Sequence, residues 1–111
     1  MTLEELESWM TDNEIHKGIN DLYGTEYFCD GYLLLFLKKY YGNNELTIHK
    51  LIMFDDEIIS TTAMCKKLSE FDINDLNYYF DSYKKQIKFF SVYTKKQKIY
   101  KKKQDLSKDF S

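Results

Sequence analysis

The sequence predicts a single small domain that is mainly α-helical and carries one β-hairpin, an α+β protein. The 111 residues are enough for one hydrophobic core. Apolar residues recur at helical spacing over most of the chain, whereas the segment after Ile87 is rich in aromatic and β-branched residues. We expect one domain over residues 1–111, with an acidic helical body in 1–57, a basic part in 58–104 and a frayed tail in 105–111.

The first helix is predicted at the N-terminus. Thr2 and Glu5 have the three-residue spacing of a capping box. Four apolar residues then fall on one helical face: Leu3, Leu6, Trp9 and Met10. A second apolar stripe is formed by Ile15, Ile19 and Leu22. Gly24 follows it at a position that is typical of a helix C-terminus.

A third helix is predicted over residues 25–41, capped by Thr25 and closed by Gly42. The segment is apolar almost all round, which is typical of a helix buried in a core or a dimer interface. Gly31 weakens this helix locally. The next segment, 45–54, fits two structures. Its alternating residues allow a strand, whereas two Asn at its start and acids at its end favour a helix of about three turns, which we prefer.

The second half of the chain is predicted to begin with a turn at 55–57 and a very short strand at 58–59. A helix capped by Ser60 or Thr61 then ends near Phe71. Asp72 caps the next helix, 72–87, which has the clearest amphipathic pattern in the chain. Its apolar positions are Ile73, Leu76, Phe80, Tyr83 and Ile87. Residues 88–101 are predicted to form a β-hairpin that turns at Lys95 and Lys96.

This order of elements resembles that of winged helix-turn-helix regulators of the MarR/SarA type. The resemblance covers roughly residues 32–101 and lies in the order of elements rather than in a motif. It implies a dimeric transcription regulator that binds double-stranded DNA. Helix 72–87 would enter the major groove and the hairpin would be the wing. Because residues 102–111 are too few for the family's dimerisation helix, the homodimer would use the N-terminal helices.

The resemblance also implies a set of DNA contacts. Asn pairs bidentately with adenine, so an AT-rich target is favoured, and lysines would neutralise phosphates. The groove-facing residues would be Asn74, Asn77, Tyr78 and Asp81. The phosphate-contacting residues would be Lys84, Lys85, Lys88, Lys95, Lys96 and Lys98.

The charge is distributed unevenly along the chain. Residues 1–57 contain 12 Asp and Glu and 4 Lys, whereas residues 58–111 contain 12 Lys and 6 Asp and Glu. Within 82–104 there are nine lysines and no acidic residue. An acidic body with one basic face is therefore expected. The same asymmetry supports an alternative function, a small phage or mobile-element protein that inhibits a host protein through its acidic face.

No pattern in the sequence indicates an enzyme or a cofactor. A Gly-rich phosphate loop, a nucleophile elbow and an H-E-x-x-H motif are all missing. Two cysteines and two histidines have no metal-ligand spacing, so we expect no metal, and both cysteines are expected in the core. These four residues are Cys29, Cys65, His16 and His49.

The predicted location is the cytoplasm of a low-GC bacterium or of a cell infected by its phage. The N-terminus lacks the basic and apolar segments of a secretory signal. The longest apolar run, residues 32–37, is far shorter than a bilayer span, so no membrane partner is expected. All 16 basic residues are Lys, and residues with GC-rich codons are scarce, which indicates an AT-rich genome.

Overall fold

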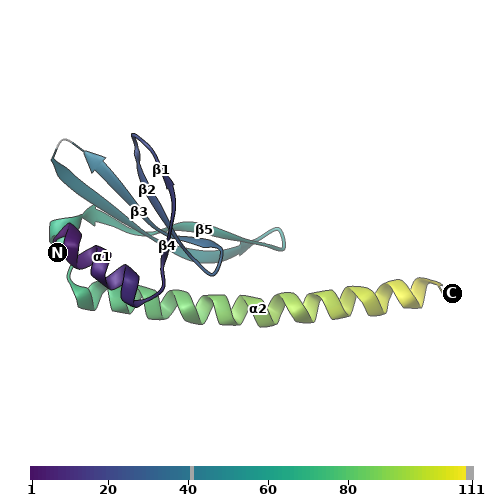
Figure 1. Cartoon of the computed structure of the whole chain (residues 1–111). Coiled ribbons are helices and arrows are strands. Elements are labelled where there is room, and N and C mark those ends of the chain that lie inside the picture. Colours follow the sequence, from purple (N-terminus) through teal and green to yellow (C-terminus); the bar gives the residue numbers. More distant parts are fainter. Residues whose placement is uncertain (41, 110–111) are drawn as a thin grey trace.

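The computed structural model describes the backbone of residues 1–40 and 42–109 and the side chains of residues 1–39 and 42–93. Along the sequence, one helix precedes and one helix follows a five-stranded antiparallel sheet, and neighbouring strands of the sheet are consecutive in the sequence (Figure 1). The elements are α1 (Leu3–Asp12), β1 (His16–Asn20), β2 (Gly24–Cys29), β3 (Tyr32–Tyr40), β4 (Asn43–Phe54), β5 (Glu57–Lys67), the 3-10 turn η1 (Leu68–Glu70) and α2 (Ile73–Asp109). The prediction of a mainly α-helical winged helix-turn-helix is therefore wrong.

Helix α1 begins as predicted. The Thr2 hydroxyl accepts a hydrogen bond from the Glu5 amide at 3.2 Å, and the Glu5 carboxylate accepts one from the Thr2 amide at 3.4 Å. Leu6, Trp9 and Met10 are buried. The second stripe does not continue this helix. Residues 16–20 form β1, and Leu22 lies in the following turn with 96% of its surface exposed.

The predicted helix 25–41 is instead the hairpin of β2 and β3. Its turn is made by Asp30 and Gly31, whose φ angles of +52° and +84° suit a type I′ turn. A register shift places Tyr27 opposite Leu35 and Phe28 opposite Leu33, so Leu34 is an extra residue in β3. Both Leu34 and Leu35 are buried. This bulge breaks the alternation of the strand and makes the segment look apolar on all sides.

The preferred helix over 45–54 and the predicted helix after residue 60 are also wrong. They form the hairpin of β4 and β5, joined by Asp55 and Asp56, which both have positive φ. The predicted short strand at 58–59 is part of β5. Four of the five residues from Ile58 to Thr62 are β-branched, and such residues favour an extended backbone. The 3-10 turn η1 leads from β5 to α2, and Phe71, which follows this turn, is buried.

Helix α2 confirms the predicted start and corrects the predicted end. The Asp75 amide donates to the Asp72 carboxylate at 2.9 Å, and the Asp72 amide donates to the Asp75 carboxylate at 3.1 Å. The helix then runs to Asp109, so the hairpin over 88–101 does not form and Lys95, Lys96 and Lys98 belong to a helix rather than to a wing. Lys and Gln, which favour helices, are frequent in this segment.

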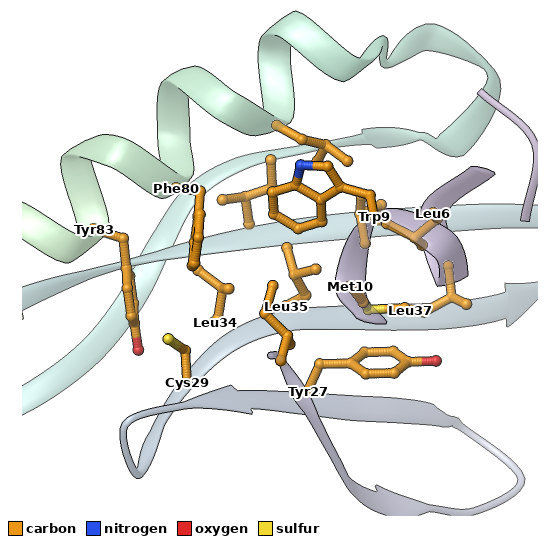
Figure 2. Close-up of a cluster of buried hydrophobic side chains, with 14 of the residues drawn as sticks. Leu6, Trp9, Met10, Tyr27, Cys29, Leu34, Leu35, Leu37, Phe80 and Tyr83 are labelled. Carbon is orange, nitrogen blue, oxygen red and sulfur yellow. The ribbon is translucent and has the colours of Figure 1, made fainter. Parts of the chain in front are cut away.

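The core lies between one face of the sheet and the two helices (Figure 2). The rings of Trp9 and Phe80 meet edge to face with centroids 5.3 Å apart. Two hydrogen bonds attach α2 to the sheet. The Gln86 side chain accepts from the Leu51 amide at 2.8 Å, and the Tyr83 hydroxyl donates to the Leu33 carbonyl at 3.4 Å. Beyond this contact α2 projects past the sheet (Figure 1), and the molecule measures 66 × 28 × 20 Å.

Candidate nucleic-acid interface on helix α2

All of the sequence-predicted contact residues lie on α2, but they occupy two different parts of it. Residues 73–87 form the half that packs on the sheet, through side chains such as Tyr83 and Gln86. Lys85 lies near the end of this half, and the part of the helix that follows it projects past the sheet (Figure 1). The side chains of Lys95, Lys96 and Lys98 lie outside the described residues. The structure therefore supplies geometry for only part of the predicted site.

The packed half does not present the predicted groove-reading face. The Trp9 indole N–H donates to the Asn77 side-chain oxygen at 2.9 Å, so this Asn joins α1 to α2. Asn74 and Tyr78 are exposed, and the Tyr78 ring meets the edge of Tyr79 at 5.3 Å. Asp81 lies 3.7 Å from the Lys84 ammonium. The predicted set is therefore split: Asn77 contacts α1, Asp81 forms an ion pair, and Asn74 and Tyr78 are exposed on the surface.

A basic and apolar surface begins after this point. It consists of Lys85, Lys88, Phe89, Val92 and Tyr93, which together line a shallow hollow of about 380 Å³. We call it the α2 surface. Phe89 is 65% exposed, Val92 49% and Tyr93 38%. Such a cluster of exposed large apolar side chains is typical of an interaction surface.

The sequence analysis missed the three apolar members of the α2 surface because it placed them in a hairpin. The signal was nevertheless present. The buried stripe of α2 runs through Leu76, Phe80 and Tyr83, and Ile87 and Phe90 continue it in partly buried form. Phe89 and Val92 do not fall on this stripe, so an unbroken helix must turn them away from the sheet.

The charge of α2 adds to this surface. Lys85 and Lys88 are exposed and form no ion pair with any residue that the structure describes. Lys84 is held in the packed half by Asp81, and its ammonium lies 4.6 Å above the centre of the Phe80 ring. The nine lysines of 82–104 all belong to this one helix. Lysine ammonium groups neutralise phosphates, and exposed aromatic rings can stack on bases.

A second surface lies where α1 meets the start of α2. Helix α1 carries four acidic residues and no basic one. With the start of α2 it forms a hollow of about 450 Å³, which we call the α1 hollow. It is lined by Glu4, Glu5, Ser8, Trp9, Asp12 and Ile73. Its carboxylates and its apolar parts would suit a partner that is both basic and apolar.

A third hollow, of about 240 Å³, lies between the sheet and α2 beside His49, Tyr78 and Gln86. The His49 Nδ1 atom is buried without a hydrogen-bond partner. Burial lowers the pKa of His49, although Glu26 and a backbone hydrogen bond with Thr61 act in the opposite direction. The ring is therefore neutral near neutral pH.

The cysteines differ from one another. Cys29 is buried as predicted, and burial together with Asp30 raises the pKa of its thiol, which disfavours the reactive thiolate. Cys65 was expected in the core, but it is exposed, with its sulfur 3.1 Å from the Glu45 carboxylate. Among the described side chains, no three His, Cys, Asp or Glu come together as metal ligands. No helix within the described part of the chain is long and apolar enough to cross a membrane.

Comparisons with protein-family models, with curated proteins and with solved structures found no match.

Proposed function

We propose that the protein binds double-stranded DNA through the projecting half of α2. The observation that carries this proposal is the coincidence of exposed lysines and exposed apolar side chains on one uncovered helix. Lys85 and Lys88 lie beside Phe89, Val92 and Tyr93, within a run of 23 residues, 82–104, that has no acid. The major groove admits an α-helix, and a lysine-rich helix in it is flanked by phosphates on both strands.

The binding proposed here is tolerant of DNA sequence. Asn77, one of the two asparagines that were predicted to read bases, is engaged with Trp9. The chain has no arginine, whose planar fork recognises guanine, and lysine acts on phosphates as a point charge. Contact with phosphates positions a protein on the duplex without selecting a sequence.

Fluorescence anisotropy of an AT-rich duplex, measured over a range of salt concentrations, tests this function. We expect affinity that falls steeply with salt, because each neutralised phosphate releases counterions. The double variant Lys85→Glu with Lys88→Glu should weaken binding and reduce the slope of log K against log salt by about 2, roughly 1 for each lysine. A scrambled duplex of equal length should bind within a few-fold of the first.

The matched control is Lys17→Glu with Lys39→Glu. Both residues are exposed on the sheet, and their reversal changes the net charge by the same amount. Equal losses for the two double variants would mean that only net charge matters, and the α2 assignment would be abandoned. Failure of the wild-type protein to bind at low salt would remove the proposed function itself.

A second candidate function is capture of a basic partner protein by the α1 hollow. The combination of carboxylates with the exposed side chain of Ile73, over the buried Trp9, in one hollow favours it. Charge reversal by Glu4→Lys with Asp12→Lys should abolish such capture, whereas the α2 lysine variants should leave it unchanged. If partner capture from a host lysate survives reversal of the hollow, this candidate fails.

A further inference from the structure

Phe89 and Val92 of the α2 surface are large apolar side chains that the sheet and α1 leave exposed to solvent. Exposed apolar side chains gathered on one face of a helix are typical of a surface that another molecule covers. The lysines beside them require an occupant that is acidic as well as apolar. A second α2 surface does not meet this requirement, because face-to-face pairing of two such helices would place lysines against lysines.

The α1 hollow has the complementary composition. Glu4, Glu5 and Asp12 surround a hollow in which Trp9 and Ile73 supply apolar surface. Glu4 and Asp12 form no ion pair among the described residues. The hollow thus carries free carboxylates where the α2 surface carries free ammonium groups, and both surfaces expose apolar side chains.

The two surfaces cannot meet within one molecule. Ile73, at the rim of the hollow, and Phe89, in the α2 surface, belong to the same continuous helix. Sixteen residues of α-helix hold them about 24 Å apart along its axis. Their complementarity can therefore be satisfied only between molecules.

We propose that the protein self-associates by docking the α2 surface of one copy onto the α1 hollow of another copy. Lys85 and Lys88 face carboxylates of the hollow, and Phe89 contacts its apolar parts. The contact joins two different surfaces and is therefore heterologous. An open chain of copies would keep one free α2 surface and one free α1 hollow at its ends, whereas a closed ring would leave neither free. The association weakens as salt screens the charges.

Sedimentation velocity at low and high salt, over a range of protein concentrations, tests the proposal with four chains. They are the wild type, Glu4→Lys with Asp12→Lys, Lys85→Glu with Lys88→Glu, and the chain that carries all four changes. These positions avoid Glu5, which takes part in the capping box. Circular dichroism checks that every variant keeps the fold.

We expect the wild type to associate at low salt. Each double variant should associate about tenfold or more weakly, because like charges then face each other. The fourfold variant should associate within a few-fold of the wild type, because its charges are exchanged and again opposite. A fourfold variant that stays as weak as either double variant overturns the proposal, and so does a wild type that stays monomeric at low salt.

This inference and the proposed DNA binding can fail separately. The Glu4→Lys with Asp12→Lys variant should lose self-association and still bind the duplex. The fourfold variant should regain self-association and still fail to bind the duplex, because its α2 surface is acidic. Loss of duplex binding in the first variant would show that the duplex is bound only by the associated form.

Discussion

The two halves of α2 differ in what their apolar side chains contact. In residues 73–87, Leu76, Phe80 and Tyr83 are buried against the sheet and α1. In residues 88–93, Phe89, Val92 and Tyr93 are exposed although the helix is unbroken. The first half therefore derives its stability from tertiary packing, whereas the second half displays side chains that packing does not require. One helix thereby both anchors the fold and carries an exposed surface that is basic and apolar.

The largest expected effect is a difference in stability between alanine variants of two phenylalanines that lie nine residues apart in α2. Phe80 is 5% exposed and meets Trp9 edge to face, so Phe80→Ala should lower the free energy of unfolding by about 3–5 kcal/mol. Phe89→Ala should change it by less than about 0.5 kcal/mol. Urea denaturation of both variants measures this difference. Similar losses from the two variants would mean that Phe89 is also part of the core.

The next effect tests the assignment of Asn77 to the packed half. Asn77→Ala leaves the Trp9 indole N–H without its acceptor in a partly buried place. We expect a loss of about 1–2 kcal/mol in the free energy of unfolding. Duplex affinity, measured by anisotropy, should stay unchanged. A variant with full stability and weakened DNA binding would return Asn77 to the groove-reading role that the winged-helix prediction gave it.

A smaller effect distinguishes the observed sheet from the predicted helix at residue 31. Gly31 has φ +84°, and a Cβ there would have open space around it, so only backbone strain opposes substitution. Gly31→Ala should destabilise the protein by about 1 kcal/mol. Within a helix the same substitution would stabilise by a similar amount. The sign of the shift in the thermal midpoint therefore decides between the two structures.

The smallest effect concerns His49. Burial holds its pKa below the ordinary value of 6.5, so the unfolded chain takes up a proton at a pH where the folded protein does not. The free energy of unfolding should thus fall as the pH drops below 6.5 and level off below the folded pKa. His49→Gln should show a weaker fall. Urea midpoints at pH 7.5 and 5.5 test this, and equal pH dependence in both proteins would contradict the burial of the ring.

The parts of the fold that sequence analysis predicted are those with one-sided patterns and explicit caps. Thr2 with Glu5 and Asp72 with Asp75 marked two helix starts correctly. The sheet was missed for local reasons. Asp30 with Gly31 is a strong type I′ hairpin signal, but it was treated as a weak point in a helix.

The sequence analysis predicted the basic charge of the candidate site but not its helical structure. The lysine-rich segment was recognised, whereas its apolar members were assigned to a hairpin because aromatic and β-branched residues are typical of strands. In a long helix, the same residues simply fall on the side that faces away from the sheet. Contacts between α2 and β4, such as that of Gln86 with Leu51, join residues far apart in the sequence, and local patterns do not reveal them.

Hydrogen–deuterium exchange of the wild-type protein, with and without an AT-rich duplex, tests the difference between the two halves of α2 most directly. Our account predicts that the duplex slows amide exchange in peptides that cover residues 84–93. Peptides from β2 to β4 should exchange at unchanged rates. Slower exchange in α1, with no change over residues 84–93, would contradict the account and place the interaction on the acidic half of the molecule.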